Sequence, residues 1–136
     1  MAIASIRAFA VALFALGLPT VVHAQWFGKS PQLVTGEEVY RHVCQSCHMD
    51  EGQGAKSPVV TVPALANNPT LATSAYPIIV VLNGKAAMPW FNGSLTPAQI
   101  AAVVGYVRTH FGNHFPEPVT EEEVKRLAGP VPRPER

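Results

Sequence analysis

Apolar residues recur along the chain at the spacing of amphipathic helices. The clearest stripe has apolar side chains on one helical face, and its members are Ile100, Val103, Val104, Val107 and Phe111. This spacing predicts a helix that packs one side against a core. The helix is expected to begin at TPAQ (residues 96–99), where Thr can cap, Pro takes the first helical position and Gln follows three residues after the cap. Gly112 is expected to end it.

Two further helices are predicted from their first turns. TGEE (residues 35–38) and TEEE (residues 120–123) each place Glu three residues after Thr, which is the spacing of a capping box. The first of these helices is expected over residues 37–43 and runs directly into Cys44. The last one is expected to stop at Gly129, and the Pro-rich tail after it should be extended or disordered.

The segment SAYPIIVVLNG (residues 74–84) permits two interpretations. Its run of β-branched residues favours a strand. Against this, Pro77 suits the first turn of a helix and Gly84 suits a C-terminal cap. We predict a helix, because no partner strand is visible elsewhere in the sequence.

Residues 50–72 show no sustained periodicity. They hold several residues that favour turns, namely Gly52, Gly54, Pro58, Pro63 and Pro69. A structureless loop of more than about 15 residues is uncommon in a compact domain. The loop therefore indicates a large cofactor that fills the space it wraps, within an all-α domain of a few helices and long loops.

The N-terminus has the pattern of a secretory signal peptide. Arg7 precedes an uninterrupted run of small and apolar residues (8–18), and short residues, Val22 and Ala24, flank His23. Spanning a bilayer takes about 20 apolar residues, so the run is too short for a comfortable anchor. Cleavage after Ala24 is expected, which would deliver the protein to the periplasm. An uncleaved signal is the alternative, and membrane association is expected only in that case.

Charge excludes one class of partner. The formal net charge is +1 and only 14% of the residues are charged. The sequence contains no basic run and no stripe of Lys and Arg, so it lacks the electrostatic footprint of a nucleic-acid-binding protein.

The sequence CQSCH (residues 44–48) contains both cysteines of the chain, and three kinds of chemistry compete for it. A dithiol–disulfide switch belongs beside a βαβ pattern, which is missing here. Tetrahedral zinc usually pairs one C-x-x-C with a second cluster of ligands, and no third cysteine exists. C-x-x-C-H is also the signature of covalent haem attachment. Thiols at i and i+3 lie on the same side of a turn, so both can reach one porphyrin edge.

Haem attachment is the interpretation we favour, with Cys44 and Cys47 as the thioether ligands of one haem c and His48 as an axial ligand of its iron. The side chain of Met88, in the loop NGKAAMPWF (residues 83–91), is the candidate for the second axial position. Met49 is adjacent to His48 and cannot reach the opposite haem face. The remaining histidines after the predicted signal peptide are His42, His110 and His114, and they are expected to be solvated.

A metal-ligating histidine needs an acceptor for its other ring nitrogen, which fixes the tautomer. A backbone carbonyl in the loop after the motif is a natural source. Pro63, in VPAL (residues 62–65), is our candidate.

With these residues in place, the sequence resembles class I cytochromes c. Gly36 and Tyr40 precede the motif as in the N-terminal helix of that family, and Tyr106 and Val107 resemble the aromatic–aliphatic pair of its last core helix. The resemblance implies the cytochrome c fold, in which Gly36 permits close helix approach against Val103 and Tyr106.

The resemblance also suggests a division of the chain. A signal peptide (1–24) and a short lead (25–34) would precede a cytochrome c domain (35–115). An extension with a short helix and the Pro-rich tail (116–136) would follow.

A narrower resemblance links residues 82–84, 88–91, 100–113 and 119–127 to haem c domains of periplasmic dehydrogenase complexes. It implies an electron carrier rather than an enzyme. The same resemblance implies that the partners of this protein are a periplasmic dehydrogenase subunit and a downstream oxidase or cytochrome. One alternative is a haem enzyme or gas-binding sensor with an open sixth iron position. Another is a structural haem subunit that docks a larger enzyme through residues 116–136.

Overall fold

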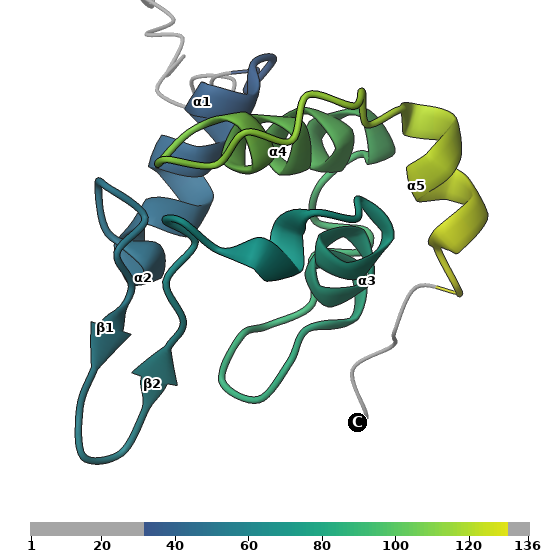
Figure 1. The fold of residues 1–136 in the computed structure, drawn as a ribbon. Coiled ribbons are helices and arrows are strands. Elements are labelled where there is room, and N and C mark those ends of the chain that lie inside the picture. The colour runs from purple at the N-terminus through teal and green to yellow at the C-terminus, as the bar shows by residue number, and fades with distance from the viewer. Residues whose placement is uncertain (1–31, 131–136) are drawn as a thin grey trace, which may run out of the picture. The chain divides into compact units, whose positions relative to one another are not determined.

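The computed structural model describes residues 32–130 of the chain (Figure 1). The predicted signal peptide (1–24), most of the predicted lead (25–34) and the tail from residue 131 onwards lie outside the described residues. Among the residues described, no helix combines the length and the apolar character that crossing a membrane requires.

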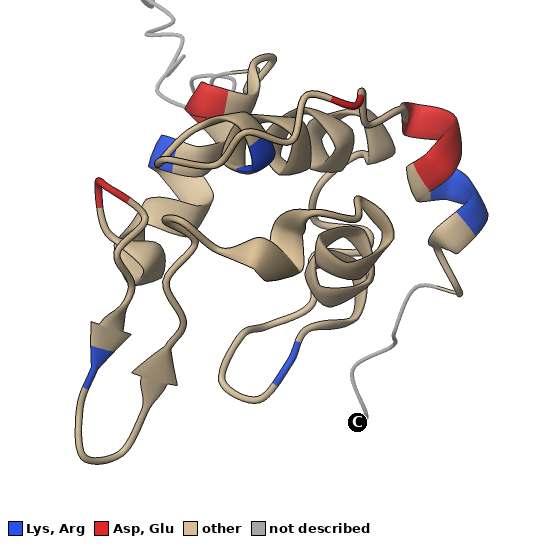
Figure 2. Cartoon of the chain, viewed as in Figure 1, with Lys and Arg blue, Asp and Glu red and all other residues tan. Residues whose placement is uncertain are grey.

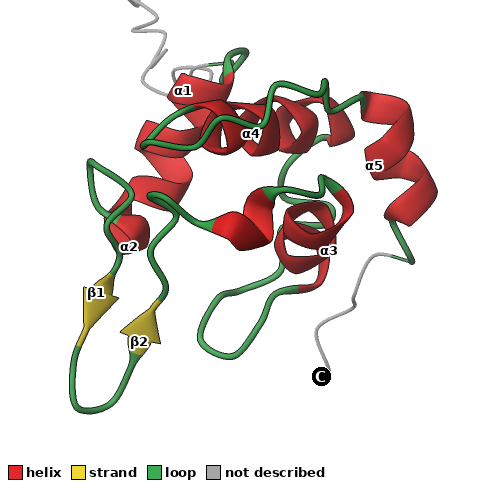
Figure 3. Ribbon diagram, viewed as in Figure 1, coloured by secondary structure: helices red, strands yellow, loops and turns green. Residues whose placement is uncertain are grey.

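Helices dominate the described residues, as the sequence predicts, and one short hairpin accompanies them (Figure 3). In chain order the elements are α1 (Gly36–Val39), a π-helical turn (Tyr40–Cys44), α2 (Gln45–His48), β1 (Ala55–Lys56), β2 (Thr61–Val62), a 3-10 turn (Pro69–Leu71), α3 (Ala75–Asn83), α4 (Pro97–Thr109) and α5 (Glu121–Leu127). The predicted all-α class is confirmed, and the antiparallel β1–β2 hairpin is an addition inside the loop that sequence periodicity left irregular.

The first helix begins where its capping box predicts. The Thr35 hydroxyl accepts a hydrogen bond from the Glu38 amide at 3.2 Å, and the Glu38 carboxylate accepts one from the Thr35 amide at 2.9 Å. The prediction that this helix stops before the cysteines is wrong. Helical structure continues through the π-helical turn and α2 to His48, because no Gly or Pro interrupts it before Met49, whose φ is 66°.

The long helix α4 also begins as predicted, with a capping box between Thr96 and Gln99 and Pro97 at its first position. It ends at Thr109, earlier than the expected Gly112. The Asn113 side-chain amide donates to the Val107 carbonyl at 2.8 Å, which satisfies a carbonyl that the continued helix would have used. Phe111 of the predicted stripe therefore lies beyond the helix.

Helix α1 crosses α4 at a glycine (Figure 1). A Cβ atom on Gly36 would lie 2.2 Å from the Ala102 carbonyl oxygen and 2.6 Å from the Tyr106 Cβ, so only glycine permits this approach. The close approach to Tyr106 is the one expected from the resemblance. The Val103 side chain is buried in the core beside the crossing.

Segment 74–84 is a helix, as predicted. Pro77 is buried in the first turn of α3, and Gly84 caps its C-terminus with φ 72°. Helix α5 packs against both α3 and α4 and buries Val124 completely. The core thus lies between α1, α3, α4 and α5, and its fully buried apolar side chains are Val39, Tyr40, Ile78, Leu82, Ile100, Val104 and Val124.

Candidate functional site

The two cysteines lie on the continuous first helix and are both free thiols. Cys44 is half-buried and Cys47 is exposed. Burial, assisted by the neighbouring Cys47, raises the pKa of the Cys44 thiol to about 11. A dithiol switch needs a thiol whose pKa is lowered. The environment of Cys44 therefore does not suit that chemistry.

His48 ends α2 with its ring buried and 8% of its surface exposed. Its Nδ1 atom lies 3.1 Å from the carbonyl oxygen of Pro63, the residue predicted from the sequence as its acceptor. A carbonyl can only accept, so Nδ1 carries the proton and Nε2 keeps its lone pair. Burial lowers the pKa of His48, while the bond to Pro63 acts in the opposite direction. The ring is thus prepared as a neutral metal ligand through Nε2.

The hairpin brings Pro63 to His48. Ala55 in β1 pairs with Val62 in β2. Pro63, the residue directly after β2, therefore lies close to the chain that leads from His48 into β1. The Gly54 amide donates to the His48 carbonyl at 3.1 Å. A Cβ atom on Gly54 (φ 69°) would lie 2.4 Å from the Val62 carbonyl oxygen, so this position requires glycine.

A second contact fixes the turn directly after His48. The Tyr40 hydroxyl donates to the Met49 carbonyl at 2.6 Å, and the Tyr40 ring is buried against Phe111, with ring centres 4.8 Å apart. The position after His48 is therefore tied to the crossing of the first helix and α4. Sequence reasoning singled out Tyr40 only for its place in the first helix and missed this hydrogen bond.

Asn113 is a third contributor that sequence reasoning missed. Its side chain is buried, donates to the carbonyl of Leu65 at 2.8 Å and accepts from the amide of Asn68 at 2.8 Å. It thereby ties the loop that carries Pro63 to the end of α4. The Gly112-Asn113 pair is a turn signal in the sequence, but the signal does not reveal these distant partners.

Met88 lies in a tight turn after α3. Lys85 and Met88 exchange two backbone hydrogen bonds of 3.0 Å each, and a Cβ atom on Gly84 would lie 2.6 Å from the Met88 carbonyl oxygen. The Met88 side chain is half-buried. Residues 83–90 line a hollow of about 300 Å³. Backbone contacts therefore fix the turn that contains Met88. At the end of this turn, the Phe91 amide donates to the Val81 carbonyl at 2.9 Å.

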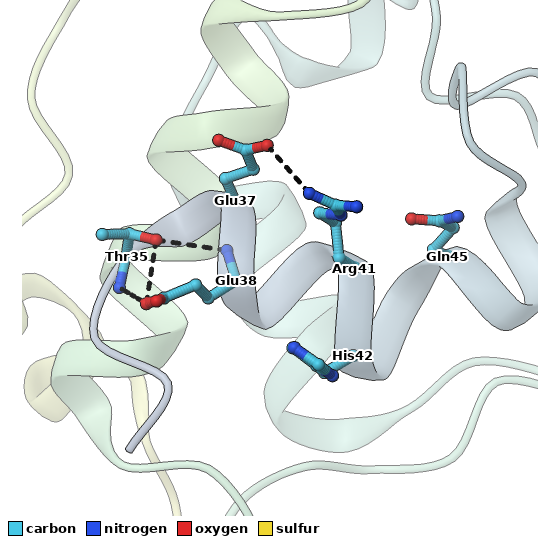
Figure 4. Close-up of a pocket in the computed structure, with 6 residues that line it drawn as sticks. All are labelled: Thr35, Glu37, Glu38, Arg41, His42 and Gln45. Carbon is cyan, nitrogen blue, oxygen red and sulfur yellow. Dashed lines mark hydrogen bonds and ion pairs between the residues drawn. The ribbon is translucent and has the colours of Figure 1, made fainter. Parts of the chain in front are cut away.

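A larger hollow of about 460 Å³ lies on the outer face of the first helix (Figure 4). It is lined by polar side chains, which are Thr35, Glu37, Glu38, Arg41, His42 and Gln45. The capping box and an ion pair of 3.7 Å between Glu37 and Arg41 account for four of them. None of the predicted haem residues lines this hollow. The three histidines expected to be solvated, His42, His110 and His114, are all exposed.

The residues at CQSCH fit a covalently bound haem. They offer two unpaired thiols and one neutral imidazole whose free nitrogen is Nε2. Among the residues that the structure describes, no three His, Cys, Asp or Glu side chains are grouped so that they could hold a metal ion.

Comparison with known proteins gives the family. The family model described as "Cytochrome C oxidase, cbb3-type, subunit III" matches residues 31–107. Cytochrome c6 of Limnospira maxima is 34% identical over 86 residues, which cover 55% of this chain and 89% of that protein.

Two other relatives are parts of dehydrogenases. The cytochrome c subunit of the quinone alcohol dehydrogenase of Gluconobacter oxydans (strain 621H) is 31% identical over 112 residues, which are 73% of this chain and 23% of that subunit. The fructose dehydrogenase cytochrome subunit of Gluconobacter japonicus is 33% identical over 93 residues, which are 57% of this chain and 19% of that subunit. The chain therefore spans about a quarter or less of these subunits.

The matches confirm the predicted cytochrome c fold, its haem c cofactor and its role as an electron carrier rather than a catalyst. With a family model that covers most of the described helices and a cytochrome c6 matched over nearly its whole length, the chain belongs to the cytochrome c family.

Proposed function

We propose that the protein is a periplasmic monohaem electron carrier that accepts electrons from a dehydrogenase subunit and passes them to a downstream oxidase or cytochrome. In this proposal Cys44 and Cys47 hold the haem by thioether bonds, and His48 and Met88 are the axial ligands. The observation that carries it is the buried His48 ring, oriented by Pro63, directly after two free thiols on one helix.

Each residue has a distinct part. Cys44 and Cys47 would hold the haem through thioether bonds, and the raised pKa of Cys44 keeps its sulfur in the protonated thiol form before attachment. His48 binds through Nε2, while the Pro63 carbonyl holds the Nδ1 proton and the plane of the ring. Haem c supplies one-electron redox chemistry when bound.

Met88 is proposed as the second axial ligand because several backbone contacts fix the turn in which it lies. The backbone of Lys85 closes the turn, Gly84 allows its approach to α3, and Pro89 restricts Met88 to an extended conformation. Ligation by Met and His raises the reduction potential and suits electron transfer. An open sixth position would suit the gas-binding or enzymatic alternative instead.

A dehydrogenase partner is supported by two relatives whose names describe cytochrome subunits of alcohol and fructose dehydrogenases. The surface of the ligand-bearing loops is compatible with transient docking. Between Glu51 and Arg108 the only charged residues are Lys56, in β1, and Lys85, in the Met88 turn, and Figure 2 shows this part of the ribbon almost entirely tan. Trp90, directly after Pro89, keeps 46% of its surface exposed.

The ligand assignment is tested by the variant Met88→Ala in the oxidised holoprotein. We expect its optical and EPR spectra to change from six-coordinate low-spin to high-spin or water-ligated iron. Met49→Ala is the matched control, because it removes the same side chain beside His48, and it should keep the low-spin spectrum. An unchanged Met88→Ala spectrum would contradict the assignment, and a wild-type protein that is already high-spin would favour the open-site alternative.

The partner is tested separately in periplasmic extracts of the host. Oxidised protein is added, and the haem absorbance is followed after addition of an alcohol, an aldehyde, a sugar acid or sulfite. Rapid reduction with one substrate class identifies the donor. Reduction at the same slow rate with every substrate would count against a dedicated dehydrogenase.

A further inference from the structure

We infer that residues 116–130, named here the C-terminal clasp, position Met88 by holding both ends of the segment that carries it. That segment runs from Ser74, before α3, to Asn92, behind the Met88 turn. The inference rests on the proposed ligation by Met88. The clasp lies outside residues 31–107, which the family model matches.

The first contact joins the clasp to the start of α3. The Ser74 hydroxyl donates to the Glu123 carboxylate at 2.5 Å, across a sequence separation of 49 residues. Ser74 occupies the N-cap position of α3 but makes no side-chain capping bond there. Glu123 has the spacing of a capping box with Thr120, yet only the Thr120 hydroxyl forms its half of that box. Neither side chain therefore makes the capping hydrogen bond that its position would allow, and the two side chains bond each other instead.

The second contact joins the clasp to the end of the Met88 turn. The Asn92 side-chain amide donates to the Gly129 carbonyl at 3.1 Å. Asn92 is also tied to α3, because its backbone amide donates to the Leu82 carbonyl at 3.4 Å. The end of the turn is therefore fixed to α3 on one side and to the clasp on the other.

Arg108 joins the base of the clasp to the chain just before Ser74. Arg108 is 1% exposed, and its guanidinium donates to the carbonyls of Leu71, Ala72 and Glu117 at 2.9, 3.1 and 2.6 Å. It also pairs with the Glu117 carboxylate at 3.1 Å. A buried guanidinium is tolerated only when its donors are satisfied. The clasp therefore supplies partners that this cation needs, and the cation in turn fixes the clasp to the entry of α3.

These contacts enclose a segment whose own turn is held by backbone bonds. A shift of residues 84–92 that moved Met88 away from its proposed place at the iron would pull on Asn92 or on α3. Loosening the clasp should therefore favour opening at the sixth position, even though no clasp residue is proposed to touch the haem.

The experiment compares Glu123→Ala with Glu122→Ala, two neighbouring carboxylates of α5 of which only Glu123 bonds Ser74. Imidazole binding to the oxidised full-length holoprotein reports how readily Met88 is displaced. We expect Glu123→Ala to bind imidazole about 3- to 10-fold more tightly than wild type, the range that loss of one hydrogen bond predicts. Glu122→Ala should match wild type.

Three further variants separate this role from general stabilisation. Ser74→Ala should reproduce the effect of Glu123→Ala, and the double variant should add little to either, because both remove the same bond. Asn92→Ala should also tighten imidazole binding. Equal imidazole affinity in all variants, with only the urea midpoint lowered, would show a merely structural clasp and overturn the inference.

Met88→Ala distinguishes failure of the clasp from failure of the ligand assignment. If Met88→Ala binds imidazole far more tightly than wild type but Glu123→Ala does not, Met88 is the ligand and the clasp does not position it. If Met88→Ala leaves imidazole binding unchanged, the ligand assignment fails and the inference fails with it.

Discussion

The regions that carry the two proposed axial ligands are built differently. The His48 ring is 8% exposed, and its Nδ1 is bonded to the Pro63 carbonyl. The next residue is held by the buried Tyr40 hydroxyl. Met88 is half-buried, and its turn is closed by two backbone bonds with Lys85.

In the proposed ligation, this difference makes His48 the fixed ligand and Met88 the exchangeable one. On the His48 side, a side-chain bond orients the ring itself, and two thioethers would anchor the same helix. On the Met88 side, the backbone positions the turn, and the support comes from α3 and the C-terminal clasp. Perturbations of the His48 side should change whether haem is retained and how the iron is tuned. Perturbations of the Met88 side should change whether the sixth position stays closed.

The largest effect is expected from the double variant Cys44→Ala with Cys47→Ala, which removes both thiols and should abolish covalent haem retention. Haem staining after denaturing electrophoresis and the intact mass of the protein would measure this. Ser46→Ala is the matched control between the two cysteines and should keep its haem. Haem that stays attached to the double variant after denaturation would refute the thioether assignment.

The next effect concerns the Met88 side. Gly84→Ala places a Cβ 2.6 Å from the Met88 carbonyl at a residue with φ 72°. We expect it to lower the unfolding free energy by about 1–3 kcal/mol and to raise the high-spin fraction. Gly105→Ala is the control, since nothing lies within 4 Å of its added Cβ inside α4. It should raise the unfolding free energy by about 0.5–1 kcal/mol. The measurements are urea unfolding and the EPR spectrum, and a low-spin Gly84→Ala protein would show that the turn does not hold the ligand.

Sequence predicts those parts of this molecule that depend on neighbouring residues. The Thr caps at Thr35, Thr96 and Thr120 are local, and all three accept the expected amide hydrogen bond. The CQSCH motif is equally local, so the haem c cofactor follows from it. The C-terminal cap of α3 depends only on the backbone φ angle of Gly84 itself, so it is also a local feature.

Distant contacts set the features that sequence did not predict. The hairpin forms because Ala55 meets Val62 across a turn, although neither strand is long enough to show periodicity. Glu123 has the spacing of a capping residue but bonds Ser74 instead, which only the packing of α5 against α3 reveals. The acceptor of His48 was predicted at Pro63 from chemistry and order along the chain, and its distance required the fold.

A smaller effect is expected on the His48 side from Gly54→Ala. The added Cβ would lie 2.4 Å from the Val62 carbonyl and 2.7 Å from the Pro63 carbonyl carbon, which should move Pro63 away from His48. Losing this acceptor makes the imidazole a weaker donor, so the reduction potential should rise while both axial ligands stay bound. Protein-film voltammetry and the optical spectrum measure the two quantities. Lys56→Ala, exposed in the same hairpin, is the control, and a potential equal to that of the control would refute a role for Pro63.

The smallest effect is expected from Tyr40→Phe, which removes the bond to the Met49 carbonyl and keeps the buried ring. At neutral pH the loss should be about 1 kcal/mol of unfolding free energy. Burial raises the pKa of Tyr40 to about 12 from the ordinary value of 10. Because the folded pKa is the higher one, the phenol contributes its full stability below pH 10 and loses it as the pH rises towards 12.

Urea midpoints of wild type and Tyr40→Phe at pH 8 and pH 11 test this pair of statements, with Tyr76→Phe on the exposed face of α3 as the control. The gap between wild type and Tyr40→Phe should narrow at pH 11, because the variant has no phenol to ionise. The gap between wild type and Tyr76→Phe should stay small at both values. A wild-type advantage that persists unchanged at pH 11 would contradict the raised pKa of Tyr40, and no advantage at pH 8 would show that the hydroxyl does not hold the turn after His48. The rigidity of that region would then come from ring packing against Phe111 and from the bond to Pro63 alone.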